Sequence, residues 1–173
     1  MITRRPIIFA LLSILASASP ALSLRAQAPA HPQYFQLTQT LAQSLVDDLP
    51  KTGPDVQCGL IHAVLYDGIN HAVIASYKLS QVGEADEAED NIVTDEQCVI
   101  INPRIEDKVA RWNVRLPVKD ASGATIKASW SIYFYRRPGV GMPEVLARAI
   151  VIRDDLAKRI PSLAALFEPA PKR

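Results

Sequence analysis

The sequence predicts a domain of the α+β class. Residues 109–136 alternate apolar and polar side chains on both sides of a turn, which is the pattern of two half-buried strands. Amphipathic helix patterns stand near both ends of the chain, over residues 33–49 and 143–160. At 173 residues, of which 49% are hydrophobic and 21% charged, the chain has the size and composition of one globular domain.

The segment 109–136 is interpreted as the main β-hairpin of the chain. A three-residue loop with Gly123 in the left-handed position of a bulge keeps all the apolar side chains on one face, whereas a four-residue loop would mix the faces. Trp112 and Trp130 then belong to the core, beneath covering helices. This register pairs Val118 with Ile126, Leu116 with Ala128, Val114 with Trp130, and Trp112 with Ile132.

Residues 1–28 have the pattern of a secretory signal peptide and leader. Arg4 and Arg5 precede an apolar run over residues 7–15, and small residues follow. The run is shorter than the roughly 20 apolar residues of a transmembrane helix, so we expect a periplasmic or secreted protein with no membrane span in the mature chain. Residues 29–173 are expected to form the single domain, with a Pro-rich tail.

The charge balance argues against a nucleic-acid partner. Removal of residues 1–28 takes away Arg4, Arg5 and Arg25, which leaves 16 basic against 18 acidic residues and a net charge of about −2. A nucleic-acid-binding protein would normally carry a basic stripe, and the sequence has none.

Cys58 and Cys98 are the two cysteines of the chain. Disulfides persist in exported proteins, and a bridge between these two would close a loop of about 40 residues, worth roughly 4 kcal/mol by the chain-entropy estimate. The alternative is two buried thiols on separate strands. The sequence leaves both open.

The chain before the main hairpin predicts a helix and a second hairpin. The helix over residues 33–49 ends at Pro50. The second hairpin joins residues 58–66 to residues 71–77. Because both of its strands are apolar on both faces, we expect them in the middle of the sheet.

Residues 80–96 carry acidic side chains and no basic one. We expect this segment to form a short acidic helix or a loop over the sheet. A short strand is predicted next, over residues 97–102, and then a connection over residues 103–108. The acids are Glu84, Asp86, Glu87, Glu89, Asp90, Asp95 and Glu96.

The C-terminal part of the chain predicts one long helix and a short turn. Pro143 begins the helix, since proline is tolerated at the first helical position. The helix runs to residue 160, and Pro161 ends it. One or two further turns are expected over residues 162–167.

Several segments resemble the extracytoplasmic sensor domains of the Cache type, which share the PAS-like fold. The resemblance rests on Leu116-Pro117-Val118, the Asp-x-x-Gly turn over residues 120–123 and the return strand 124–136. The hairpin VLYDGINHAVIAS is also similar to the first two strands of Cache domains. The resemblance spans about residues 33–167. It implies a free-standing binding domain with a five-stranded antiparallel PAS/Cache-like sheet, and with an N-terminal and a C-terminal helix packed on one face.

The polar face of the main hairpin is the candidate binding site. Arginine binds carboxylates through paired hydrogen bonds, and tyrosine and serine add directional ones. We expect a small anionic ligand there, such as an organic acid or an amino acid. The alternative is a solvated sheet face without a ligand. The residues of this face are Arg111, Asn113, Arg115, Ser129, Ser131 and Tyr133.

Other candidate chemistry carries less weight. The acidic segment could bind Ca²⁺ but lacks the EF-hand spacing, so we expect a solvated acidic segment. His62 and His71 lie on adjoining strands near Cys58, and a metal site or a Cys–His pair would need them on one face within hydrogen-bond reach. We expect ordinary sheet histidines, with no metal, no cofactor and no catalytic residue.

The expected function is therefore that of an exported sensor-like domain, not an enzyme, that binds a small anionic molecule. The alternative is a periplasmic accessory protein that acts through an unidentified protein partner, without a small ligand. A pocket beneath residues 80–96 would favour ligand binding, whereas a cleft with His62, His71 and an acid together would favour an enzyme.

Overall fold

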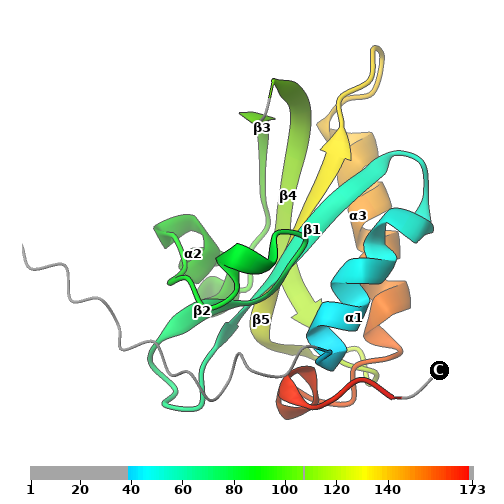
Figure 1. Ribbon diagram of the computed structural model, residues 1–173. Coiled ribbons are helices and arrows are strands. Elements are labelled where there is room, and N and C mark those ends of the chain that lie inside the picture. The colour runs from blue at the N-terminus through cyan, green and yellow to red at the C-terminus, as the bar shows by residue number, and fades with distance from the viewer. Residues whose placement is uncertain (1–38, 107, 172–173) are drawn as a thin grey trace, which may run out of the picture.

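A five-stranded antiparallel sheet forms the centre of the molecule (Figure 1). The computed structural model describes residues 39–106 and 108–171, so the predicted signal peptide and leader, 1–28, lie outside the described residues. The strand order is β2-β1-β5-β4-β3. The strands are β1 (Val56–Val64), β2 (His71–Ser76), β3 (Ile100–Glu106), β4 (Val109–Lys119) and β5 (Thr125–Tyr135).

The helices lie on both faces of this sheet. Helices α1 (Leu41–Asp48) and α3 (Met142–Ala157) cover one face, and α2 (Ala88–Glu96) lies on the other (Figure 1). The predicted α+β class, the antiparallel sheet and the common face of the first and last helices are confirmed. Three short 3₁₀ segments complete the described chain: η1 (Leu49–Thr52), η2 (Leu79–Gln81) and η3 (Ala164–Phe167). Among the described residues, no helix is long and apolar enough to span a membrane.

The core lies between the apolar face of the main hairpin and the helices α1 and α3. Trp130 and Leu116 are fully buried there, as are Leu45 of α1 and Ile152 of α3 to within 2%. The predicted core position of Trp130 is confirmed. Trp112 lies at the margin, half-buried, with the Arg136 guanidinium 5.0 Å from the centre of its ring.

The predicted hairpin register is correct at the turn and wrong beyond it. Gly123 has φ +86°, and Lys119 pairs with Thr125, as the three-residue loop requires. An irregularity between Pro117 and Lys119 then shifts β5 by two residues, so that Leu116 faces Trp130, Val114 faces Ile132 and Trp112 faces Phe134. Because side chains alternate with a period of two, this shift keeps each side chain on its predicted face.

Helix α1 begins later than predicted. Thr40 is its N-cap, and the backbone N–H of Gln43 donates to Thr40 Oγ1 at 3.1 Å. Threonine is a favoured N-cap because its hydroxyl accepts a hydrogen bond from a first-turn N–H that has no partner within the helix. The residues of the predicted helix up to 38 lie outside the described range.

Strand β2 lies at an end of the sheet order, not in its middle as predicted. Its outer edge is covered by the segment 83–86, where the Val73 N–H donates to the Glu84 carbonyl at 3.0 Å and the Gly83 N–H donates to the Val73 carbonyl at 2.9 Å. This cover pairs backbone N–H and C=O groups that would otherwise be unpaired at the edge of the sheet.

Strand β3 lies at the opposite end of the sheet and occupies Ile100–Glu106, where we predicted the end of a strand and then a connection. The predicted strand ended at Asn102, just before Pro103, and proline has no N–H to donate. At a sheet edge that N–H has no neighbouring strand to bond, so the strand continues through Pro103 and carries Arg104.

Of the two alternatives for the cysteines, the disulfide is not formed, since Cys58 and Cys98 are both free. Cys58 is buried on β1, and Cys98 is half-buried just before β3, with its Sγ 3.9 Å from the Ile92 carbonyl oxygen. Strands β5 and β4 separate β1 from β3, a spacing of roughly 14 Å at the usual distance between strands, which a disulfide cannot bridge.

Candidate functional site

The polar face of the main hairpin is buried beneath α2 and the chain that leads into it. The common face of the predicted residues is confirmed, and the alternative of a solvated face is wrong. None of the six is more than 7% exposed: Arg111, Asn113, Arg115, Ser129, Ser131 and Tyr133.

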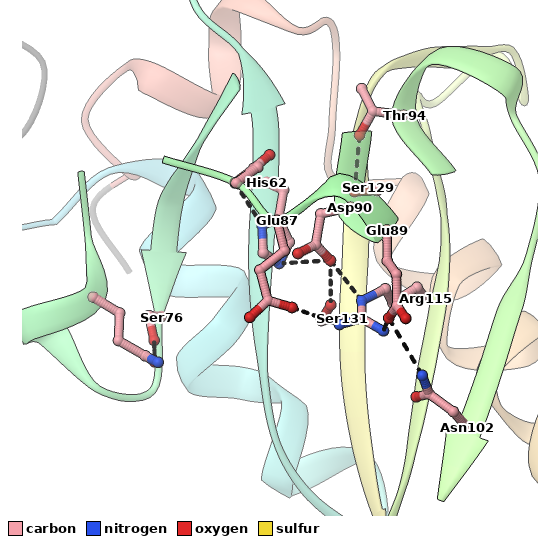
Figure 2. Close-up of polar contacts among 12 residues, drawn as sticks. His62, Ser76, Glu87, Glu89, Asp90, Thr94, Asn102, Arg115, Ser129 and Ser131 are labelled. Carbon is pink, nitrogen blue, oxygen red and sulfur yellow. Dashed lines mark hydrogen bonds and ion pairs between the residues drawn. The ribbon is translucent and has the colours of Figure 1, made fainter. Parts of the chain in front are cut away.

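Arg115 is the centre of the contacts between this face and α2. Its Nε donates to Asp90 Oδ1 and its Nη1 donates to Glu89 Oε2, each at 2.6 Å. Figure 2 shows the guanidinium between these two carboxylates, with Ser131 beside Asp90. Asn102 on β3 also donates to Glu89 Oε2, at 3.3 Å. The acidic helix is thus attached to the sheet by charge-assisted hydrogen bonds, which are stronger than neutral ones.

His62 on β1 links two acids of the same segment. Its Nδ1 lies 2.8 Å from Asp86 Oδ1, and its Nε2 lies 3.7 Å from Asp90 Oδ1. An ionised carboxylate only accepts hydrogen bonds, so Nδ1 donates when Asp86 is charged. Burial raises the pKa of Asp86, and the hydrogen bond from His62 offsets only part of that rise. In the described chain, His62 Nε2 and Asp86 Oδ2 are buried without a hydrogen-bond partner.

A pocket of about 100 Å³ lies between the sheet and the acidic segment. This is the pocket beneath residues 80–96 that would favour ligand binding. Its volume equals that of roughly three molecules of liquid water, which suits a carboxylate or amide group rather than a large ligand. Ser131 and Tyr133 form part of its floor, and its charged lining consists of His62, Glu84, Asp86, Glu87, Asp90, Arg104 and Arg115.

A second polar network lies farther along the same face. Arg111 Nη1 donates to Glu106 Oε2 at 2.9 Å, while Tyr77 and Lys78 donate to Glu106 Oε1 at 2.9 and 2.7 Å. The Arg111 guanidinium lies 5.8 Å from the ring centre of Tyr133. Burial raises the pKa of Tyr133 to about 12, so its hydroxyl stays protonated and can donate.

The structure divides the predicted ligand residues into two groups. Arg115, Ser131 and Tyr133 line the pocket. Arg111 belongs to the second network, and Ser129 accepts a hydrogen bond from Thr94 Oγ1 at 2.9 Å, as Figure 2 shows. The last of the six, Asn113, is fully buried, and its amide has no hydrogen-bond partner among the described residues.

Sequence reasoning missed the residues that complete the pocket. Asp86, Glu87 and Asp90 were recognised only as part of an acidic run, because nothing in the sequence says which strand that run covers. Arg104 was placed in a connection. A signal for Arg104 does exist, since proline is compatible with an edge strand and Asn102, Arg104 and Glu106 alternate around it.

Each of the two histidines faces an acid and not Cys58. His71 Nε2 lies 3.6 Å from Asp95 Oδ2, whereas His62 faces Asp86 and Asp90. Over residues 39–106 and 108–171, no group of three His, Cys, Asp or Glu side chains is placed to hold a metal ion. The pocket has guanidinium groups that donate hydrogen bonds and carboxylate and imidazole groups that accept them. Together these groups can bind a small polar molecule.

No protein-family model matches the chain, and no curated protein matches it. A solved structure that is similar is the sensor domain of DcuS from E. coli, with a TM-score of 0.41 and 9% sequence identity, covering 72% of this chain and 86% of that one. At this score the likeness is distant, and neither a ligand nor a role follows from it.

Proposed function

We propose that this protein is an exported sensor-like domain that binds a small molecule, and that an anionic group of the molecule contacts Arg104 and Arg115. The observation that carries the proposal is the position of these two arginines, on neighbouring strands, in the lining of the pocket beneath the acidic segment. Guanidinium groups bind carboxylates through two parallel hydrogen bonds.

The composition of the pocket narrows the chemical class of the ligand further. Glu84, Asp86, Glu87 and Asp90 line it together with the two arginines, so a ligand with an anionic group alone would meet repulsion. A hydroxy acid or an amino acid would also present a donor to an acceptor such as His62 Nε2, which has no hydrogen-bond partner among the described residues. Small acids that also carry a donor are therefore the favoured class.

Among the described residues, the protein supplies no nucleophile to the pair Asp86–His62. An Asp–His pair acts as a general base when the free ring nitrogen reaches a nucleophile. Within the described chain, His62 Nε2 has no hydroxyl or thiol at hydrogen-bond distance. We propose that the pair Asp86–His62 holds the acidic segment on the sheet.

Thermal shift assays of the purified protein with lactate, glycolate, alanine and the amides of these acids test the proposal. A ligand that binds the native state raises the melting temperature by mass action, so we expect a rise with at least one acid and none with its amide. Absence of a rise with every acid would contradict the proposal.

Two buried arginines of β4 give a matched pair of variants. Arg115 and Arg111 are 2% and 4% exposed and each is paired with acids, but only Arg115 lines the pocket. We expect Arg115→Gln to abolish the acid-dependent rise and Arg111→Gln to retain it. If Arg115→Gln does not fold, Arg104→Gln replaces it, since the Arg104 side chain is 35% exposed. A rise that persists in both pocket variants would overturn the proposed site.

A further inference from the structure

Glu87 occupies the space between the two arginines of the pocket. It is the N-cap residue of α2, but its side chain makes no capping hydrogen bond. Instead, its Oε2 lies 3.4 Å from Arg104 Nη2 and 3.6 Å from Arg115 Nη2. Figure 2 shows the Glu87 side chain directed toward Arg115. A carboxylate carried by the chain itself thus lies where the proposed function places the anionic group of the ligand.

The contacts of Glu87 are the weakest that Arg115 makes. Asp90 and Glu89 accept from Arg115 at 2.6 Å, and Asp90 is 5% exposed. The Glu87 side chain is 66% exposed, and its distances to the arginines are near or beyond the limit of a hydrogen bond. The pair with Arg104 is partly exposed on both sides, and ion pairs near the surface contribute little because water replaces the lost contact. Of the three carboxylates, Glu87 therefore leaves its place most easily.

We propose that Glu87 is a specificity-determining residue, a tethered carboxylate that the carboxylate of a small acid displaces from between Arg104 and Arg115. This inference rests on the proposed function. It explains how a pocket with several acids accepts an anion, because one carboxylate replaces another and the charge around the arginines stays the same. A neutral ligand cannot make this exchange, so Glu87 selects acids over their amides.

Glu84 provides the matched control. It also lines the pocket and is exposed, and within the described residues it is not ion-paired to either arginine. Glu84→Gln and Glu87→Gln therefore remove the same charge from the same wall, but only Glu87→Gln removes a competitor for the arginines. Both positions are on the surface, so both variants are expected to fold, which circular dichroism checks.

Isothermal titration of lactate and glycolate into the full chain measures the effect. We expect Glu87→Gln to tighten binding about two- to fivefold, the range that corresponds to loss of an exposed ion pair. Glu84→Gln changes only the screened field, so we expect less than about twofold. Equal tightening in both variants, or none in Glu87→Gln, would overturn the role of Glu87.

The same titration separates this inference from the function on which it rests. If the acids bind the unaltered protein, Arg115→Gln abolishes binding and Glu87→Gln leaves the affinity unchanged, the pocket stands and the exchange is wrong. If neither the unaltered protein nor Glu87→Gln binds any of the acids, both the pocket and the exchange are wrong.

Discussion

Arg115 Nε donates a hydrogen bond to Asp90 Oδ1 at 2.6 Å, and both side chains are at least 95% buried. This pair joins β4 to α2 and closes one side of the pocket. Its consequence for stability follows from its burial, because a charge left alone in the interior is far more costly than one on the surface.

Replacement of the acid of this pair is expected to destabilise the protein strongly. In Asp90→Ala, the short ion pair that remains to the buried Arg115 is the one with the partly exposed Glu89. We expect the free energy of unfolding to fall by about 3 kcal/mol in urea denaturation. Asp155→Ala is the control, because its pair with Lys158 has exposed fractions of 66% and 74%. We expect no measurable change there. Equal effects of the two substitutions would contradict the structural role of the buried pair.

Acid stability should depend on Glu106. Burial alone would raise the pKa of Glu106, but hydrogen bonds from Lys78 and Tyr77 outweigh it and hold the pKa below its ordinary value of 4.5. A carboxyl whose pKa is lowered by folding contributes stability above its unfolded-state pKa and loses that contribution as the pH falls through the folded-state value. The contribution should therefore begin to fall near pH 4.5 and be lost at lower pH.

Urea denaturation at a series of pH values measures this contribution. The free energy of unfolding of Glu106→Gln should fall less steeply in the acid range than that of the unaltered protein, and the two curves should converge. Asp120 and Asp154 also have lowered pKa values, but they act equally in both proteins and cancel. Parallel curves for the two proteins would show that Glu106 has no such role.

The two cysteines should differ in reactivity. Burial raises the pKa of Cys58 to about 11, whereas Cys98 is half-buried. Because the thiolate is the reactive form, a thiol reagent added to the native protein should modify Cys98 first and Cys58 only on unfolding. Denatured protein without reductant should then show both thiols. Their absence from that titration would mean that the cysteines are oxidised.

The main hairpin should be sensitive to cavities on its apolar face. Leu116 is fully buried, so Leu116→Ala is expected to lower the free energy of unfolding by about 2–5 kcal/mol. Ile105, at the end of β3, is 78% exposed, and Ile105→Ala should stay within about 0.5 kcal/mol of the unaltered protein. A small effect at Leu116 would place the core elsewhere than between the sheet and α3.

The local elements of the fold could be predicted because their signals are local. The alternation along residues 109–136 assigned each side chain of the hairpin to a face, and the two-residue shift beyond Pro117 left those faces unchanged. Gly123 predicted the turn of the hairpin because few other residues adopt a positive φ. Helices α1 and α3 followed from apolar periodicity, although the N-cap at Thr40 set the true start of α1.

The candidate site was only half predictable. That Arg115, Ser131 and Tyr133 share a face could be predicted, since it follows from the strand period. Only the folded chain shows that Asp90 and Glu87 lie over them, that His62 comes from a strand beyond β5, and that Arg104 completes the pocket from an edge strand. Strand order and helix docking are set by contacts between segments far apart in the chain, and a periodic pattern carries no information about which distant segment its outer face will meet.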